Sequence, residues 1–226
     1  MKYSFAIASA LLLIPSTLAL APSKRAIIPF FNPVLGGGSW LDNAGSGGGE
    51  PLNVVISAFS SAAVLTDDGI LNYARAIGFS NECFNIHLGD PQSANLGDGH
   101  GAVNQTIELR QDFGDAALGT CLESLIGGNH FRVYRQNGPL ANTGALFLAV
   151  SKEENVTENH TISPDGYDVG RDSLVAAAVG QTSFGGVDYT TTSQTLLNEM
   201  PAGATGVNHG IAVDGTVVLL TVTITS

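Results

Sequence analysis

Two short stretches decide the fold: Asn129-His130-Phe131-Arg132-Val133-Tyr134-Arg135 and Gly144-Ala145-Leu146-Phe147-Leu148-Ala149-Val150. Both are rich in the aromatic, aliphatic and β-branched residues that favour strands. The turn signal Asn137-Gly138-Pro139 stands between them. We therefore predict two strands, over residues 130–135 and 145–150, that pair as a β-hairpin.

Further strands are expected on either side of this hairpin. Residues 52–59 are rich in β-branched side chains, and residues 106–113 alternate between apolar and charged side chains. Near the C-terminus, Asp214-Gly215 separates the apolar runs 210–213 and 216–225, which is a strong hairpin signal. Together these patterns predict five or six strands and a C-terminal β-hairpin.

Three segments have the apolar periodicity of amphipathic helices. We expect these helices to begin at Asp67 or Asp68, at Asp115, and at Asp168 or Asp172, and to end before Gly78, Gly127 and Gly180. In the second helix the side chains expected to face inward are Leu118, Cys121, Leu122 and Leu125. Helices and strands follow in mixed order, which predicts an α+β fold: a single domain over residues 51–226 with a mixed or antiparallel sheet of five to six strands.

The first twenty residues have the order of a secretory signal peptide. A positive charge at Lys2 precedes an apolar run over residues 5–14, and small residues follow at Ala19 and Ala21. An apolar run of about ten residues is too short to cross a bilayer, which needs roughly 20. We therefore expect a signal peptide over residues 1–20 and a secreted, extracellular product without a membrane anchor.

Residues 21–50 are expected to be a short propeptide followed by a flexible, glycine-rich tail. The dibasic pair Lys24-Arg25 fits a processing-protease site, after which the mature chain would begin at Ala26. Glycine-rich runs flank Trp40, and a high glycine density resists ordering. Trp40 itself either docks on the domain or serves as a binding anchor.

The chain is acidic, with 20 acidic and 9 basic residues and a formal net charge of −11. Residues 1–25 hold three of the basic residues and no acidic one, so without them 6 basic residues stand against 20 acidic ones, a charge of −14. Such a field repels phosphate backbones and anionic lipids. We expect no nucleic-acid partner and no membrane insertion. We expect the protein to be a monomer that binds an unidentified extracellular ligand or protein.

The two cysteines and three sequons also indicate an extracellular protein. Cys83 and Cys121 are expected to form a disulfide, because pairing is the default in an oxidising compartment. Asn-x-Ser/Thr sequons begin at Asn104, Asn155 and Asn159. The last two lie within five residues of each other, which predicts a glycosylated surface loop in a eukaryotic glycoprotein.

Standard catalytic and metal-binding motifs do not occur in the sequence. There is no Gly-x-Ser-x-Gly elbow, no His-Glu-x-x-His and no Asp-x-Asp-x-Asp-Gly loop. Two cysteines are too few for a thiolate zinc site of the usual kind. Asp165, Asp168 and Asp172 are interpreted as turn and helix-cap residues rather than calcium ligands. We therefore expect no cofactor and no metal.

The most distinctive residues lie between positions 129 and 172. After the strand that contains His130 come an apolar strand, a histidine and an Arg-Asp pair. Over about 45 residues this order resembles the domain at the C-terminus of LssY-type bacterial membrane proteins. The matching positions are His130, Arg132, Arg135, His160 and the Arg171-Asp172 pair. The chain departs from the family at Tyr134, where tryptophan is usual, and in having one histidine at position 160 where the family often has two. The resemblance implies a fold more than a function.

Two interpretations of this region stay open. In the first, His130, His160 and Asp172 form a catalytic group, because imidazoles and a carboxylate can transfer protons or hold a metal. In the second, His130 makes a polar contact on the strand face that it shares with Arg132 and Tyr134, and His160 is an exposed loop residue.

The candidate binding residues are Arg132, Tyr134, Arg135 and Arg171. Because the sequence contains no complete catalytic motif, the favoured function is a non-catalytic extracellular binding protein, acting at a cell surface or as an effector in a host–microbe setting. One alternative is a secreted hydrolase that uses the two histidines and Asp172. The other is a carrier of a small molecule or lipid, which would need a sizeable apolar cavity.

Overall fold

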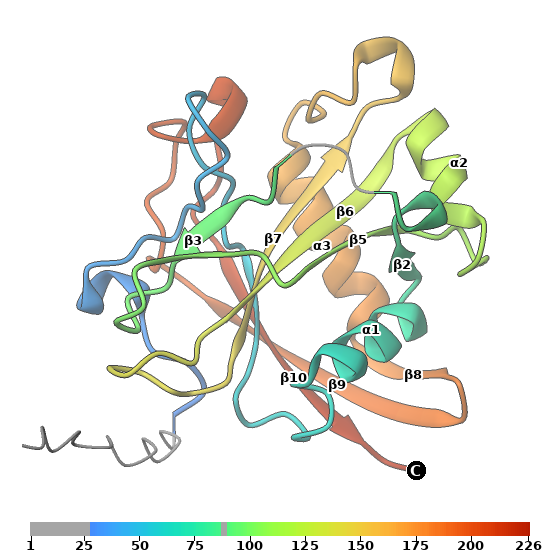
Figure 1. Cartoon of the computed structure of the whole chain (residues 1–226), viewed down its shortest axis with the longest axis horizontal. Helices are drawn as coiled ribbons and strands as arrows, with labels where there is room; N and C mark the ends of the chain where they lie inside the picture. The colour runs from blue at the N-terminus through green and yellow to red at the C-terminus, as the bar shows by residue number, and fades with distance from the viewer. Residues whose placement is uncertain (1–27, 87–89) are drawn as a thin grey trace, which may run out of the picture.

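The computed structural model describes residues 28–86 and 90–226 (Figure 1). The expected signal peptide over residues 1–20 and the expected processing site at Lys24-Arg25 lie outside the described residues. Within residues 28–86 and 90–226, no helix is long and apolar enough to cross a membrane.

A curled, mixed sheet of eight strands forms the centre of the molecule (Figure 1). In spatial order the strands are β2 (Phe79–Asn81), β5 (Ile107–Gln111), β6 (Gly128–Arg135), β7 (Leu146–Glu153), β1 (Val54–Ile56), β10 (Val217–Ile224), β9 (Val187–Leu196) and β8 (Gly180–Phe184). Only β1 and β10 pair in parallel; the other neighbours are antiparallel. A separate two-stranded sheet joins β3 (Ser93–Asn95) and β4 (Ala102–Asn104).

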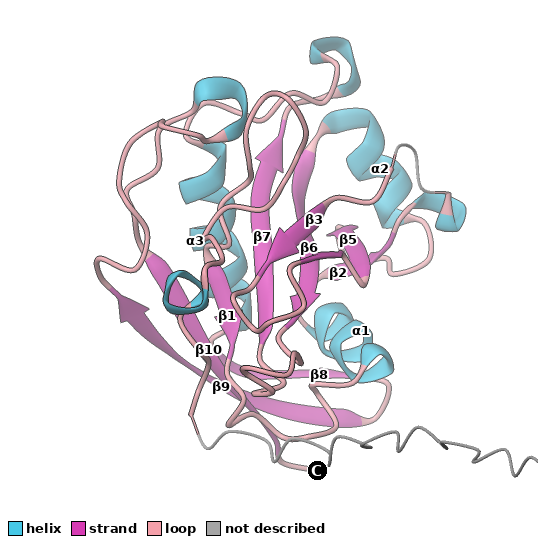
Figure 2. Ribbon diagram, turned by 60° about the vertical axis from the view of Figure 1, so that its left-hand side comes forward, coloured by secondary structure: helices cyan, strands magenta, loops and turns pink. Residues whose placement is uncertain are grey.

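Three α-helices accompany the sheet: α1 (Asp67–Ala76), α2 (Gly119–Ile126) and α3 (Gly166–Ala178). Short 3-10 turns are η1 (Pro33–Gly36), η2 (Cys83–Asn85), η3 (Val156–Glu158) and η4 (Asn208–Gly210). The three predicted helices are thus present: α1 begins at Asp67 as predicted, whereas α2 begins four residues later than Asp115 and α3 two residues before Asp168. Helix α1 is capped by Thr66, whose Oγ1 accepts a hydrogen bond from the amide of Gly69 at 3.0 Å. Figure 2 shows α2 on the β5 side of the sheet.

Both faces of the sheet are buried, because successive residues of its central strands point to opposite sides. On the first face, which we call the helix face, Ile56, Leu148 and Leu220 pack with residues of α1 and α3. On the second, the loop face, Phe147 packs with Trp40 and with loop residues. The candidate site described below lies on the loop face.

The predicted hairpin over residues 130–135 and 145–150 is confirmed as β6 and β7. Its register pairs His130 with Ser151 and Arg132 with Ala149. The predicted disulfide is also present: Cys83 is bonded to Cys121, with Cα atoms 4.7 Å apart. It links η2 to α2.

The α+β class fits roughly, but the predicted sheet of five to six strands is wrong. Strand β2 and the hairpin of β8 and β9 were not expected, and no strand was predicted where β3 and β4 lie. These strands are short or carry many exposed polar side chains, so they lack the apolar alternation that predicts a strand.

The predicted C-terminal hairpin around Asp214-Gly215 is also wrong. Strand β10 pairs with β9 on one side and with β1 on the other, and Val213 bridges to Gly203 instead. The carboxylate of Asp214 accepts a hydrogen bond from the amide of Thr216 at 2.7 Å and binds Arg171. Asp214 therefore takes part in an ion pair and a local hydrogen bond rather than in a two-residue β-turn between paired strands.

Residues 32–50 were expected to pack poorly, and that expectation is wrong. Trp40 is buried on the loop face, with its ring centroid 5.6 Å from that of Phe147 and 5.9 Å from that of Phe30. Backbone bridges join Leu41 to Pro51 and Asn43 to Ser93. Of the two interpretations of Trp40, docking on the domain is confirmed.

Helix α2 has the opposite orientation to the one predicted. Its buried residues are Gly119, Thr120 and Glu123, while Leu118, Leu122 and Leu125 are exposed. The physical reason is the carboxylate of Glu123, which points inward to an arginine. The side of the helix that faces the protein is thus the one that carries Glu123, which is fully buried against the partly exposed Arg110.

Candidate functional site

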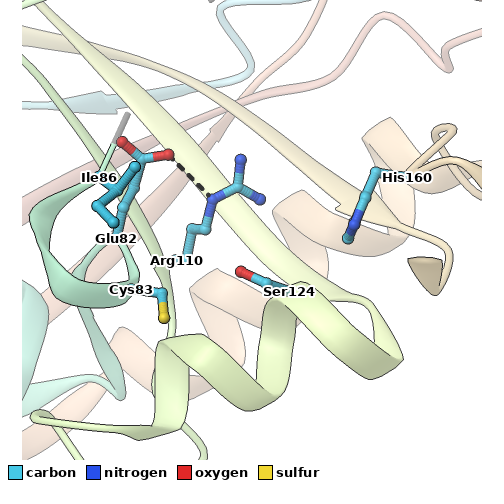
Figure 3. A pocket seen from close by; sticks show the side chains of 6 residues that line it. All are labelled: Glu82, Cys83, Ile86, Arg110, Ser124 and His160. Carbon is cyan, nitrogen blue, oxygen red and sulfur yellow. Dashed lines mark hydrogen bonds and ion pairs between the residues drawn. The ribbon is translucent and has the colours of Figure 1, made fainter. Parts of the chain in front are cut away.

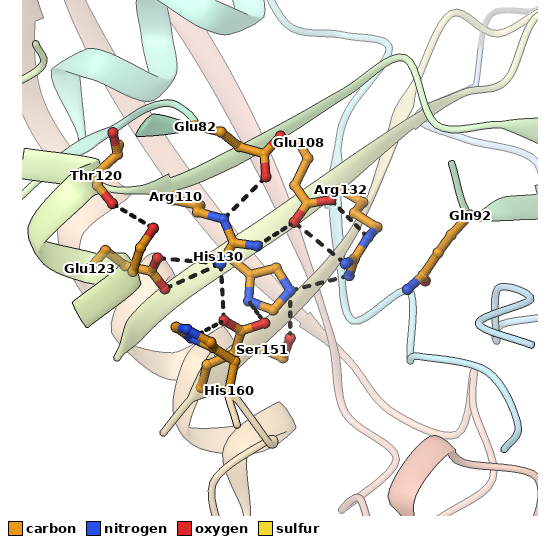
Figure 4. Close-up of polar contacts among 12 residues, drawn as sticks. Glu82, Gln92, Glu108, Arg110, Thr120, Glu123, His130, Arg132, Ser151 and His160 are labelled. Carbon is orange, nitrogen blue, oxygen red and sulfur yellow. Dashed lines mark hydrogen bonds and ion pairs between the residues drawn. The ribbon is translucent and has the colours of Figure 1, made fainter. Parts of the chain in front are cut away.

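A network of charged side chains lies on the loop face, where β5 and β7 end and β6 begins (Figure 4). The strand register brings it together. Opposite residues of β5 and β6 pair Glu108 with Arg132 and Arg110 with His130. On the other side of β6, His130 lies opposite Ser151, two residues before Glu153. Alternation then places all these side chains on one face.

Arg110 lies at the centre of the network. Its guanidinium contacts four glutamates, at 2.9 Å from Glu153, 3.0 Å from Glu108, 3.2 Å from Glu123 and 3.3 Å from Glu82. These carboxylates come from β5, β7, α2 and the residue before η2. One arginine therefore joins four separate parts of the chain.

Arg132 is the second cation of the network. Its guanidinium lies 2.6 Å from Oε2 of Glu50 and 3.2 Å from Oε2 of Glu108. Glu108 thus bridges Arg132 and Arg110. Glu50 comes from the N-terminal segment, so this ion pair also ties that segment to the sheet.

His130 is fully buried between these groups, and its contacts define its tautomer. Nη1 of Arg132 lies 3.1 Å from its Nε2, and Oγ of Ser151 lies 3.3 Å from the same atom. Because a guanidinium can only donate, Nε2 is the acceptor and the ring proton sits on Nδ1. That atom faces Oε1 of Glu153 at 3.5 Å. Burial, followed by the nearby Arg132 and Arg110, lowers the pKa of His130 well below its ordinary value of 6.5, so the ring is neutral.

Two glutamates of the network bind protons near neutral pH. Burial raises the pKa of Glu50 to about 7, although the charge of Arg132 acts to lower it. Burial likewise raises the pKa of Glu123 to about 7, against the effect of Arg110. The network contains five glutamates and two arginines. Its formal charge is therefore about −3 above pH 7 and closer to −1 when Glu50 and Glu123 are protonated.

A pocket of about 300 Å³ opens onto this network (Figure 3). Its lining residues are Glu82, Cys83, Ile86, Arg110, Ser124 and His160. Figure 3 shows Arg110 between Glu82 on one side and His160 on the other, with Ser124 projecting from α2. His160 is partly exposed, and its Nδ1 lies 3.6 Å from Oε2 of Glu153. The pocket therefore leads from the surface to the charged side chains.

The structure brings together some of the predicted site residues and not others. His130 and His160 both face the carboxylate of Glu153, each at about 3.5 Å. Asp172 lies on α3 instead, with its side chain 68% exposed and Oδ1 2.9 Å from Nε of Arg171. The carboxylate between the two histidines is Glu153 rather than Asp172.

Three of the candidate binding residues have structural partners. Arg171 is buried and forms a bidentate ion pair with Asp214, with Nη1 2.7 Å from Oδ1 and Nη2 2.9 Å from Oδ2. Arg135 contacts the carbonyl oxygen of Leu65 and the carboxylate of Asp67. The hydroxyl of buried Tyr134 donates to Oδ2 of Asp42 at 2.7 Å. Of the four candidates, only Arg132 belongs to the charged network.

The three sequons differ in exposure. Asn104 on β4 and Asn159 after η3 are exposed, whereas Asn155 is half-buried. The Oδ1 of Asn155 accepts a hydrogen bond from the amide of Thr157 at 2.9 Å, which forms a local turn. His160 follows Asn159 directly, so a glycan on Asn159 would stand beside the pocket rim.

Sequence reasoning missed most carboxylates of the network. Glu108 and Arg110 were seen as the polar side of a strand, but nothing in the local pattern marks that side as buried. Within residues 28–86 and 90–226, no group of three or more His, Cys, Asp or Glu side chains has the arrangement of a metal site. Comparison with protein-family models, with curated proteins and with solved structures gives no match for this chain.

Proposed function

We propose that this chain is a secreted glycoprotein that acts by binding, and that its ligand carries a positive charge and enters the pocket over Arg110 and His160. The disulfide between Cys83 and Cys121 supports an extracellular location, as do the signal-peptide pattern and the three sequons. The ligand class is a small ammonium or guanidinium compound, or a side chain of that kind on a peptide.

The charge of the network carries this proposal. Five glutamates surround two arginines, so the guanidiniums are more than neutralised. A pocket walled by protein focuses the field of such an excess of negative charge toward its opening. Glu82 lines the pocket directly, and Ser124 adds a hydroxyl that can accept a hydrogen bond from an ammonium group.

The state of His130 favours binding over hydrolysis. Its Nε2 accepts from Arg132 and Ser151, its Nδ1 lies 3.5 Å from Glu153, and the fully buried ring is not among the residues that line the pocket. A general base must reach the proton that it removes from a substrate or a water molecule. His160 is the histidine that lines the pocket, and it stands at the rim.

Titration with small amines tests the proposal. Propylamine, putrescine and agmatine are added to the secreted protein at pH 8, with propanol as the neutral control, and binding is followed by NMR and calorimetry. Glu82→Gln should weaken amine binding about tenfold, because a close charge contact is worth roughly 1.5 kcal/mol. Glu158→Gln on exposed η3 should leave it unchanged. Equal binding of propanol, or no effect of Glu82→Gln, contradicts a cation site.

The pH dependence gives a second readout. As pH falls through about 7, Glu50 and Glu123 gain protons and the network loses negative charge, so amine affinity should decrease. A lysine-containing peptide and free N-acetyl-lysine amide, measured in parallel, separate a peptide ligand from a small free amine. Recovery of each probe unchanged by mass spectrometry is expected; a chemically altered probe would show that the site is catalytic.

Secretion and glycosylation are tested by expression in a eukaryotic host. The protein should appear in the medium, and treatment with an N-glycosidase should lower its mass. We expect the mature N-terminus at Ala26 and a glycan on Asn155 or Asn159. Retention of an unglycosylated product inside the cell would contradict the proposed location.

A further inference from the structure

Helix α2 and the neighbouring turn η2 expose an unusual number of large apolar side chains. Six of them are between 42% and 72% exposed. We call this set the α2 patch; it consists of Phe84, Ile86, Leu118, Leu122, Leu125 and Ile126. Figures 1 and 2 both show α2 at the outer edge of the molecule, beside β5 and away from α1 and α3.

The outward orientation of these side chains is built into the fold. At the start of α2, a Cβ on Gly119 would lie 1.4 Å from the carbonyl oxygen of Asp112, so the helix backbone contacts the body of the protein there. In the middle, Glu123 is fully buried against Arg110. The apolar side chains cannot turn inward without breaking this ion pair and leaving Arg110 with one fewer carboxylate.

The patch is continuous across its two elements. The disulfide between Cys83 and Cys121 holds η2 against α2, and Ile86 lines the same pocket as Ser124 of α2. Leu118, the N-cap residue of α2, and Leu122 and Leu125 within it follow the spacing that places side chains on one face of a helix. The patch therefore spans two elements that a disulfide joins.

Its area is a large part of one side of a protein interface. At about 150 Å² per fully exposed large side chain, the six side chains leave roughly 500 Å² of apolar surface. The largest apolar patch on a typical monomer is about 300–600 Å². A stable complex buries roughly 800 Å² on each partner. The α2 patch thus lies toward the upper end of what a free monomer exposes and would supply more than half of one side of a standard interface.

We propose that the α2 patch is the interface of a symmetric homodimer, in which α2 of one copy packs antiparallel against α2 of the other, with Leu122 near the two-fold axis. A helix face with leucines at regular spacing can interdigitate with a second copy of itself. The chain as a whole is acidic, but the only charged residue of α2 is Glu123, which is buried. When two copies of α2 pack together, the helices therefore bring no exposed like charges into contact.

The charge pattern favours a second copy over a lipid surface. Helices that lie in a membrane interface usually carry lysine or arginine on their polar face. Helix α2 contains neither, and the nearest network cation, Arg110, is held by four carboxylates. The dimer replaces the monomer expected from the sequence, and it does not depend on the ligand proposed for the pocket.

Analytical ultracentrifugation of the secreted protein over a concentration series tests the dimer. The wild-type chain should sediment as a dimer at micromolar concentration. Added salt should strengthen the association, because it screens the repulsion between two acidic chains. The double variant Leu122→Asp/Leu125→Asp should be monomeric and still folded, with a melting temperature that matches the wild type only at concentrations where the wild type is itself monomeric, since both positions are exposed. Leu197→Asp, at a position that is 69% exposed after β9, is the matched control and should remain dimeric.

A glycan placed in the patch gives an independent test. Leu122→Asn creates a sequon with Glu123 and Ser124, so a eukaryotic host would attach a sugar at the centre of the interface. Gln181→Asn creates the matched sequon with Thr182 and Ser183 on β8, at the opposite edge of the sheet. The first glycosylated variant should be monomeric and the second dimeric.

Three results would overturn the proposal. The first is a wild-type chain that stays monomeric up to submillimolar concentration. The second is a dimer that survives both the paired aspartates and the glycan at position 122. The third is co-sedimentation of monomeric protein with neutral phosphatidylcholine vesicles that is lost in Leu122→Asp/Leu125→Asp, which would assign the α2 patch to a lipid surface.

Discussion

Nη1 of Arg132 lies 3.1 Å from Nε2 of His130, inside the protein and on the same face of β6. The guanidinium donates to an imidazole that must stay neutral, because a protonated ring would place two cations in contact. The contact therefore connects the protonation state of His130 to the ion pairs that Arg132 makes with Glu50 and Glu108.

Replacement of the two histidines should separate structure from binding. His130→Ala should lower the free energy of unfolding by about 2 kcal/mol, because it leaves a cavity and removes an acceptor from buried Arg132. His160→Ala should change stability little and alter amine binding in the pocket. Thermal denaturation and NMR titration measure the two effects, with His100→Ala, which is exposed, as the control. Wild-type stability of His130→Ala would contradict its structural role.

Stability should be greatest at mildly acidic pH. Folding raises the pKa of Glu50 and of Glu123 from about 4.5 to about 7, so their contribution is fully present below pH 4.5 and is lost as pH rises through 7. His130 acts in the opposite sense: its pKa is lowered, so stability is lost as pH falls below 6.5. Between pH 6.5 and 4.5 the folded chain holds two extra protons on the glutamates and lacks one on His130, so the melting temperature should rise as pH falls from about 7 toward 4.5.

The variant Glu50→Gln tests the contribution of Glu50 to the pH dependence of stability. Glutamine resembles the protonated glutamate, so the variant should lose less stability than the wild type between pH 5 and 8. Glu158→Gln, on exposed η3, should reproduce the wild-type curve. Melting temperatures measured across this pH range provide the comparison; parallel curves for Glu50→Gln and wild type would argue against proton uptake at Glu50.

Asp214→Asn should destabilise the protein more than Asp172→Asn. Both carboxylates contact Arg171, but Asp214 holds the buried guanidinium with two oxygens, whereas Asp172 is largely exposed. We expect a loss of about 1–2 kcal/mol for Asp214→Asn, measured by urea denaturation at pH 7. The hydrogen bonds from Arg171 lower the pKa of Asp214 to about 2, so this contribution is lost only as pH falls below about 4. Equal losses in the two variants would contradict the assigned roles.

Removal of the disulfide should cost about 4 kcal/mol, since Cys83 and Cys121 close a loop of 38 residues. The double variant Cys83→Ser/Cys121→Ser should therefore melt at a clearly lower temperature. Hydrogen exchange should rise first in α2 and η2, because the disulfide joins them directly. Unchanged exchange in α2 would mean that Glu123 and the backbone contact of Gly119 suffice to hold the helix.

The sequence predicted those elements whose local pattern agrees with their place in the fold. Strands β6 and β7 are rich in aromatic, aliphatic and β-branched residues and flank a clear turn signal, so their pairing could be predicted. Strand β9 carries a row of threonines and serines, and most of its side chains are exposed. Its pairing with β10 becomes visible only when the apolar residues of β10 are placed in the sheet. A strand that is stabilised mainly by a distant partner strand has no local sequence pattern from which it can be predicted.

The candidate site was harder to predict, because it depends on contacts between distant residues. The sequons predict that position 153 begins the glycosylated surface loop, over residues 153–161, but β7 extends to Glu153 and its register with β6 places this buried side chain beside His130. The orientation of α2 shows the same limit. Its leucine spacing predicts an apolar face, but the direction of that face follows from Arg110, which lies on another element and requires Glu123 as a partner.

The position of β10 has a consequence for synthesis. In chain order β10 is the last strand of the sheet, yet in space it lies between β1 and β9. Until it has been made, the sheet exists as two separate halves, one running from β2 to β1 and the other consisting of β8 and β9. The hydrophobic core therefore cannot be completed from the N-terminus onward during synthesis, because it needs the last strand. The sequons at Asn104, Asn155 and Asn159 precede β10 by more than fifty residues, so glycosyl transfer would meet a polypeptide whose central strand is still missing.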